Sequence, residues 1–156
     1  MLLSPVRTVL LVDDSEDDIF LFQRAHVKAK ADFNLRTAPS GRDAMNYLAG
    51  EGVFADKAAY PRPQLVVLDI KMPLVSGFDV LRWIRSTEAI KDLVVVMFSA
   101  SMMESDLQKA YGLRANSYLV KPGDSLHLTQ IVSLFEQYWM NTNVVPSVPF
   151  WNSAFV

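Results

Sequence analysis

Cysteine is absent from this chain, and histidine occurs only twice in 156 residues. Without cysteine there are no disulfides and no thiolate metal sites, and two unclustered histidines argue against a zinc centre. Long apolar runs are also missing, because no stretch approaches the roughly 20 residues that span a bilayer. The N-terminal run Met1-Leu2-Leu3-Ser4-Pro5 is too short for the apolar core of a signal peptide. These absences predict a cytoplasmic protein.

A strong charge of either sign is missing as well. The 15 basic and 17 acidic residues give a formal net charge of -2. Such a balance creates no field that would draw the chain onto nucleic acid or an anionic membrane, so we expect neither partner. What the chain has is apolar content: 51% hydrophobic residues suffice for the packed core of one domain.

Short apolar runs alternate with stretches of helical period along the chain. The expected strands are 8–12, 33–38, 65–69, 93–98 and 117–120, and the expected helices are 16–30, 40–49, one from near 77, 103–111 and 125–139. Strict alternation of this kind predicts a parallel sheet with right-handed helical crossovers. Glycines at 50 and 52 and the run Pro61-Arg62-Pro63 predict a loop before the third strand.

Charged residues close three of the expected strands. Asp13-Asp14 follows the first, Asp69 ends the third and Lys121 follows the fifth. In a parallel sheet these positions meet at one edge, in the crevice where ligands bind. Crowded carboxylates repel one another unless a cation lies among them, and oxygen ligands favour magnesium or calcium over zinc. The sequence therefore predicts a divalent-cation site.

These strand ends are part of a larger ordered pattern. Its elements are Asp13-Asp14, Asp69, Met72-Pro73 with Gly77, Ser99-Ala100 and Lys121-Pro122. In this order the chain resembles a receiver domain of a two-component response regulator over roughly residues 6 to 140. The resemblance implies an α/β fold of the flavodoxin-like, doubly wound (βα)5 type, with strand order 2-1-3-4-5.

The resemblance also implies a chemistry. Asp69 would take a phosphoryl group from a phosphohistidine, since a carboxylate is already ionised at neutral pH. Asp14, Asp69 and the backbone carbonyl of Lys71 would bind Mg²⁺, and Asp13 would act through a coordinated water. Lys121 would pair with Asp69 before phosphorylation and with a phosphoryl oxygen afterwards. The chain would then be a phosphoacceptor with slow self-dephosphorylation, and not an enzyme acting on other substrates.

Ser99 and Tyr118 carry the switch in this family. Ser99 would turn to hydrogen-bond the phosphoryl group, and the Tyr118 ring would rotate from an outward to an inward position, changing the face formed by the last two helices and the strand between them. The alternative is that Ser99 caps a turn and the Tyr118 hydroxyl lies in water. The peptide before Pro122 is usually cis in receivers, and we expect the same here.

A subgroup within the family is also indicated. The segment from Gly50 to Pro63 is longer than usual, and Asn143-Val144-Val145-Pro146 follows the last helix. Both features resemble receivers that accompany bacterial and cyanobacterial phytochromes. The alternative is an inert surface loop, because long insertions cost little closure entropy.

Partners follow from the predicted domain boundaries. Residues 1–140 are expected to form the receiver and 141–156 an apolar, aromatic tail with no effector domain. Output must then be binding, to an unknown downstream protein. The input partner implied by the resemblance is a sensor histidine kinase or a phosphotransfer protein. The tail could fold back, or extend a homodimer interface on the face around Tyr118; a disordered tail is the alternative.

Three other functions can be weighed against the receiver. A phosphatase of the haloacid-dehalogenase type needs a second acid two residues after its nucleophile, where this chain has Lys71. A flavodoxin-like flavin carrier needs a phosphate-binding loop after the first strand, and the acidic run 13–18 would repel a phosphate. A receiver fold used only as a scaffold is the third, and the complete set of acceptor-site residues argues against it.

Overall fold

The computed structural model describes residues 7–145, and the predicted order of five strands and five helices is confirmed. The elements are β1 (Thr8–Val12), α1 (Glu16–Lys28), β2 (Asn34–Ala38), α2 (Gly41–Ala49), η1 (Gly52–Ala55), β3 (Leu65–Leu68), α3 (Gly77–Ser86), β4 (Val94–Ser99), α4 (Glu104–Gly112), β5 (Ser117–Val120), α5 (Ser125–Leu134) and η2 (Phe135–Met140). All strand pairs are parallel, in the predicted order 2-1-3-4-5.

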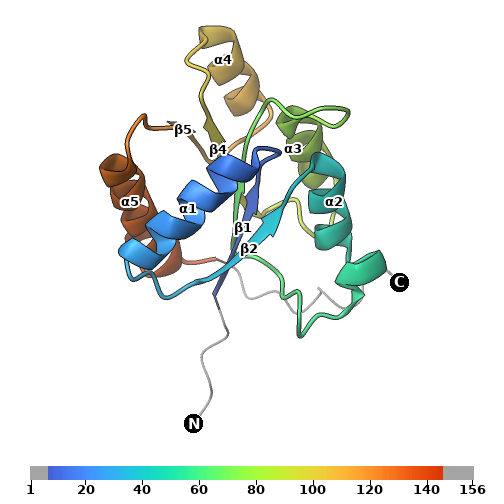
Figure 1. Ribbon diagram of the computed structural model, residues 1–156. Helices are drawn as coiled ribbons and strands as arrows, with labels where there is room; N and C mark the ends of the chain where they lie inside the picture. Colours follow the sequence, from blue (N-terminus) through green and yellow to red (C-terminus); the bar gives the residue numbers. More distant parts are fainter. Residues whose placement is uncertain (1–6, 146–156) are drawn as a thin grey trace.

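Helices cover the sheet on both faces, and the strands alternate their side chains between the two layers. Figure 1 shows α1 and α5 together on one side, with α2 and α3 on the other. Leu10, Val66 and Val95 face the α2–α3 layer, while the adjacent Val9 and its counterparts in β3 and β4 face the α1–α5 layer. Because both faces are covered, β1, β3 and β4 are buried along their whole length.

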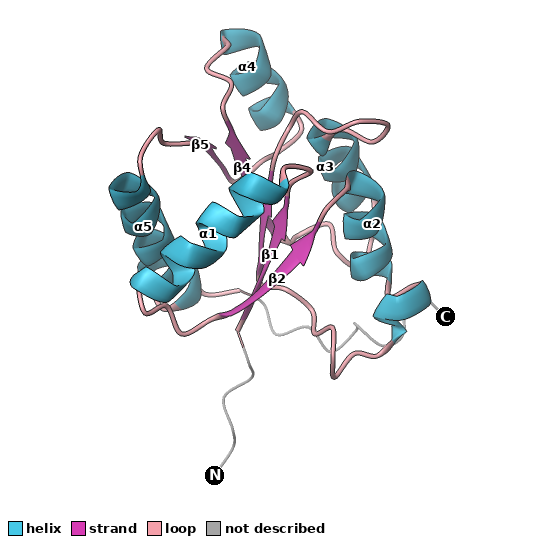
Figure 2. Ribbon diagram, viewed as in Figure 1, coloured by secondary structure: helices cyan, strands magenta, loops and turns pink. Residues whose placement is uncertain are grey.

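The helix starts follow the local sequence. Ser15, Ser40 and Ser76 each accept a hydrogen bond from the backbone N–H three residues on, which satisfies a donor at the helix start. At Ser76 the bond is reciprocated by Asp79, which forms a complete capping box. Caps of this kind fix where α1, α2 and α3 begin, and therefore where the strand-end loops stop (Figure 2).

The buried face of α1 is formed by Phe22 and Ala25, and Phe20 is 56% exposed. The expected extent of the last helix was wrong. The last helix does not remain α-helical to Trp139, since Phe135–Met140 forms a π-helical turn. That turn buries both Phe135 and Met140, whose sequence spacing does not fit one face of a regular α-helix.

The segment after α2 is packed onto the domain. Tyr47 is fully buried and donates a hydrogen bond to the Pro61 carbonyl at 2.9 Å. Its ring lies 5.3 Å from Phe54 and 5.7 Å from Tyr60, measured between ring centroids. This three-ring cluster attaches the segment to α2, and the sequence prediction of a loop had included none of these contacts.

Candidate acceptor and metal site

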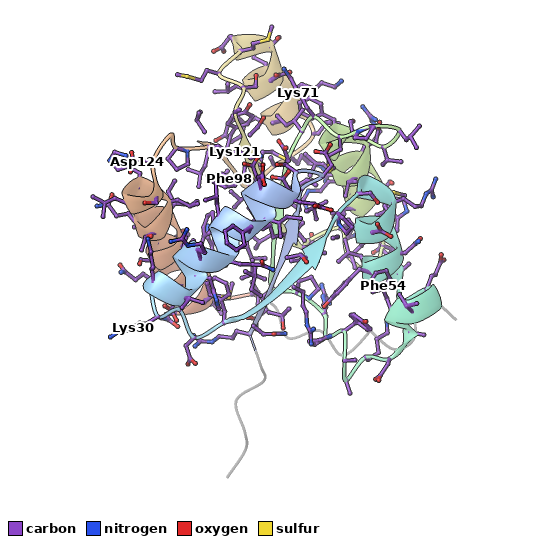
Figure 3. All side chains as sticks on the ribbon, viewed as in Figure 1. Lys30, Phe54, Lys71, Phe98, Lys121 and Asp124 are labelled. Atoms are coloured by element: carbon purple, nitrogen blue, oxygen red, sulfur yellow. The ribbon has the colours of Figure 1, made fainter. Side chains whose placement is uncertain are left out.

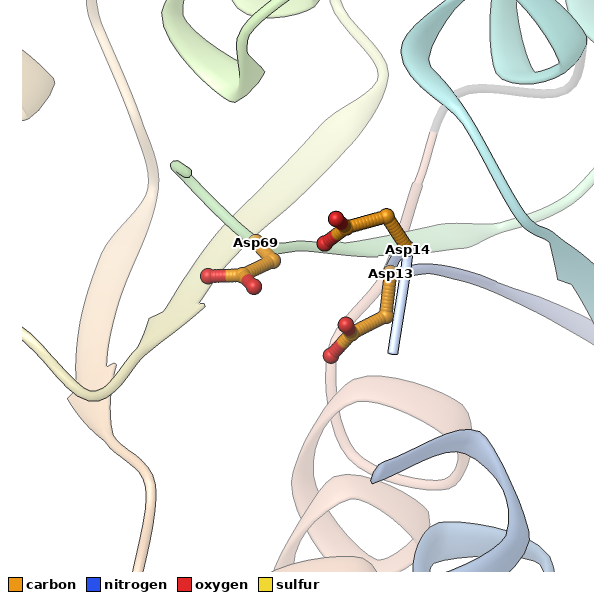
Figure 4. Close-up of side chains that lie close together, drawn as sticks. All are labelled: Asp13, Asp14 and Asp69. Atoms are coloured by element: carbon orange, nitrogen blue, oxygen red, sulfur yellow. The ribbon is translucent and has the colours of Figure 1, made fainter. Parts of the chain in front are cut away.

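Three carboxylates meet at the carboxyl ends of β1 and β3, as the sequence predicted. Oxygen atoms of Asp13, Asp14 and Asp69 all lie within 4.8 Å of one another, and Figure 4 shows the three side chains around one space. Asp13 and Asp69 are buried, whereas Asp14 is exposed. A cluster of hard oxygen donors with one open side matches the requirements of Mg²⁺, which keeps several waters when bound.

The Asp69 side chain is fixed by the backbone around it. Its Oδ1 accepts a hydrogen bond of 2.7 Å from the Ile70 N–H, and its own N–H donates to the Val12 carbonyl. The loop beyond returns closely, because the Gly77 N–H donates to the Ile70 carbonyl at 2.9 Å. A Cβ at Gly77 would lie 1.9 Å from the Asp69 carbonyl oxygen, so this approach requires glycine.

Lys121 binds more carboxylates than the sequence suggested. Its Nζ donates to Asp13 at 2.7 Å, to Asp18 at 2.8 Å and to Asp69 at 3.1 Å. The pair with Asp69 was expected, but the contact with Asp18 was not. Asp18 lies in the first turn of α1, and its contact with Lys121 is a part of the site that the sequence analysis missed.

The cluster shifts the pKa of two of its members. Burial raises the pKa of Asp13, and this effect outweighs the hydrogen bond from Lys121 that lowers it. Burial alone would lower the pKa of Lys121, but its hydrogen bonds to Asp13 and Asp18 and the charge of Asp69 raise that pKa above its ordinary value. Lys121 therefore remains an ammonium ion throughout the neutral range.

Ser99 and Tyr118 lie on the strands next to the cluster. Ser99, the last residue of β4, is buried, and its Oγ accepts a hydrogen bond from the Ser101 N–H at 3.2 Å. The Tyr118 hydroxyl donates to the Ser101 carbonyl at 2.9 Å, and its ring packs against the α2–α3 side of the core. The alternative of a Tyr118 hydroxyl in water is wrong. The Tyr118 side chain is half-buried, and Ser101 is a residue of this region that the sequence prediction missed.

Two remaining expectations differ in outcome. Among residues 7–145 no peptide bond is cis, so the expected cis bond before Pro122 is wrong, and Lys121 reaches the carboxylates through a trans peptide. Lys71 has an exposed side chain, and Figure 3 labels it at the same end of the molecule as Lys121. The role of its backbone carbonyl as a metal ligand stays a prediction.

Comparisons with known proteins identify the family. The profile of the response regulator receiver domain matches residues 9–133. This chain belongs to the response regulator receiver family. It is 31% identical over 144 residues to the response regulator Rcp1 of Synechocystis sp., an alignment that covers 92% of this chain and 96% of Rcp1.

Solved structures give the same result. The phosphorylated cyanobacterial phytochrome response regulator RcpA is 35% identical with a TM-score of 0.82, and the alignment covers 90% of this chain and 99% of that one. The Mn²⁺-bound form of Rcp1 is 31% identical with a TM-score of 0.78, over the same shares of the two chains. The resemblance to phytochrome response regulators is therefore confirmed. Within residues 7–145, no helix is both long and apolar enough to cross a membrane.

Proposed function

We propose that this receiver accepts a phosphoryl group on Asp69 from the phosphohistidine of a sensor kinase or phosphotransfer protein. A carboxylate oxygen of Asp69 attacks phosphorus while the phosphorus–nitrogen bond breaks, and the electron pair of that bond returns to the imidazole. The observation that carries the proposal is the meeting of Asp13, Asp14 and Asp69 with Lys121 at one sheet edge. The complete set favours a phosphoacceptor over both an enzyme and a mere scaffold.

Magnesium fits the donor set. Asp14, Asp69 and the Lys71 carbonyl would hold the ion, with Asp13 acting through a bound water, and Rcp1, a relative of this chain, has been solved with Mn²⁺. When bound, the ion offsets the negative charge that builds up during phosphoryl transfer. Lys121 then contributes a fixed positive charge beside the reacting oxygen, and Ser99 a hydroxyl that can donate to a phosphoryl oxygen.

The output surface is the face formed by α4, β5 and α5. It exposes apolar side chains that a partner could cover, namely Tyr111, Val120, Leu126 and Leu134. We propose that phosphorylation changes the binding of this face, either to a second copy of the chain or to a downstream protein. The tail was proposed to extend such a homodimer; its residues 146–156 lie outside the described part of the chain. By analogy with RcpA, we propose that the sensor kinase is a phytochrome and that phosphoryl transfer takes place in the cytoplasm.

Beryllofluoride tests the acceptor role without any kinase. With Mg²⁺ it should bind at Asp69 and shift the NMR signals of Ser99, Tyr118 and their neighbours, and the variant Asp69→Asn should not respond. If the spectrum of the wild type stays as unchanged as that of Asp69→Asn, the protein is a scaffold. Light scattering of the same samples tests the dimer. Removing residues 144–156 should weaken self-association, and an unchanged mass across concentration would contradict the role of the tail.

A further inference from the structure

Lys121 is bound by one carboxylate that belongs neither to the acceptor nor to the proposed metal ligands. Asp18 lies in the first turn of α1, and its Oδ2 is 2.8 Å from the Lys121 Nζ. The side chain of Asp18 is 42% exposed, compared with 3% for Asp13 and 11% for Asp69. Lys121 is thus bound on one side by buried acceptor-site carboxylates and on the other by a helix residue closer to solvent.

The three bonds use the full capacity of the ammonium group. A lysine has three N–H donors, and those of Lys121 are directed at Asp13, Asp18 and Asp69. The bond to Asp69, at 3.1 Å, is the longest of the three. A phosphoryl oxygen on Asp69 can therefore gain a bond from Lys121 only if one of these three bonds is given up. The bond to Asp69 itself is the one replaced, and the shorter bonds to Asp13 and Asp18 then limit how far the ammonium group can follow the new oxygen.

We propose that Asp18 is a positioning residue, which holds Lys121 toward α1 and competes with the phosphoryl group for the ammonium. Asp13 adjoins the metal site, and Asp69 is the acceptor itself. Asp18 differs from both, because it can affect the acceptor only through its bond to Lys121 and through its charge. The side chains of Asp18 and Lys121 also line an open pocket between α1 and α5, together with Leu21, Pro122 and Leu128. The inference rests on the proposed function, because the competing anion is the phosphoryl group on Asp69.

The affinity for beryllofluoride in the presence of Mg²⁺ measures this competition. Asp18→Ala should bind it about two- to fivefold more tightly than the wild type, the range expected for one partly exposed ion pair. Asp17→Ala is the matched control, because Asp17 lies in the same first turn of α1 and its removal changes the net charge equally. Its affinity should equal that of the wild type, and Asp18→Glu should restore the wild-type value.

The NMR signal of the Lys121 ammonium nitrogen, measured in metal-free protein, reports the position of the lysine directly. Three hydrogen bonds slow proton exchange, so the wild type and Asp17→Ala should show this signal, and Asp18→Ala should lose or broaden it. An unchanged signal in Asp18→Ala would overturn the inference. The inference would also be overturned if Asp18→Ala bound beryllofluoride no more tightly than the wild type. The same holds if Asp17→Ala gained as much affinity as Asp18→Ala. If the wild type itself binds no beryllofluoride, the proposed function fails instead.

Discussion

Gly77→Ala is predicted to damage the acceptor loop and the stability of the domain together. The new Cβ would lie 1.9 Å from the Asp69 carbonyl oxygen, 2.8 Å from the Asp69 carbonyl carbon and 2.9 Å from the Ile70 Cα. Real Cβ atoms essentially never approach other atoms within 3.0 Å, and all three of these atoms belong to the backbone. The start of α3 must therefore move away by about 1 Å or more, since a packed interior cannot absorb the overlap.

The cost can be estimated from two effects. Overpacking costs about 1–3 kcal/mol, and loss of the Gly77–Ile70 hydrogen bond about 1 kcal/mol more, so the free energy of unfolding should fall by about 2–4 kcal/mol. For a domain of this size the Tm should drop by roughly 4–16 °C. Because the crowded backbone atoms belong to Asp69 and Ile70, the overlap also pushes on the acceptor, and the affinity for beryllofluoride with Mg²⁺ should fall as well.

Urea unfolding followed by circular dichroism measures the stability change. Gly123→Ala is the control, because a Cβ at Gly123 meets nothing within 4 Å. Its unfolding midpoint should stay close to that of the wild type. If Gly77→Ala unfolds at the same urea concentration as Gly123→Ala, the close approach of α3 to the acceptor backbone is wrong.

Other predictions concern groups around the site. Tyr47→Phe should cost about 1–3 kcal/mol by leaving the Pro61 carbonyl unpaired. Burial raises the pKa of Tyr47 to about 12. The protonated Tyr47 side chain therefore contributes fully to the free energy of unfolding below about pH 10, the pKa in the unfolded chain, and this contribution is lost as pH rises through the pKa of the folded state. Between these values the free energy of unfolding should fall less steeply with pH in Tyr47→Phe than in the wild type. Identical slopes would contradict this. Hydrogen bonds from the Ser76 backbone and hydroxyl hold the pKa of Asp79 below its usual value. Asp79 therefore stabilises the fold above its pKa in the unfolded chain, and this stabilisation is lost as pH falls through the pKa of the folded state. The free energy of unfolding of Asp79→Asn should lack this acid-dependent loss. Ser76→Ala should cost about 0.5–2 kcal/mol in urea unfolding, and no change would argue against the capping box. Arg85 donates to the carbonyls of Lys91, Leu93 and Arg114; Arg85→Lys should cost about 1.5–3 kcal/mol without changing beryllofluoride affinity, and an altered affinity would contradict a purely structural role.

The strands could be predicted from the sequence because their burial is continuous. The runs in β1, β3 and β4 are apolar on both faces, so their bounds followed from composition to within a residue or two. Charges at strand ends predicted the meeting of Asp13, Asp14, Asp69 and Lys121, since parallel topology places those ends together.

Features that depend on tertiary contacts were not predictable in this way. Burial of Tyr47 depends on the return of Phe54 and Tyr60, which no local period shows. The π-helical turn at Phe135–Met140 arises where packing on the core overrides the regular helical spacing. Asp18 fits any solvated first turn of a helix, and only the position of Lys121 makes it part of the site.

Phosphorylation of Asp69 is tested by the intact mass of the protein after incubation with Mg²⁺ and acetyl phosphate, under a mildly acidic quench. We expect a gain of one phosphoryl group in the wild type and no gain in Asp69→Asn. An equal gain in both proteins would place the acceptor elsewhere. No gain in the wild type, with acetyl phosphate or with phosphorylated histidine kinases, would contradict the claim that this receiver is a phosphoacceptor.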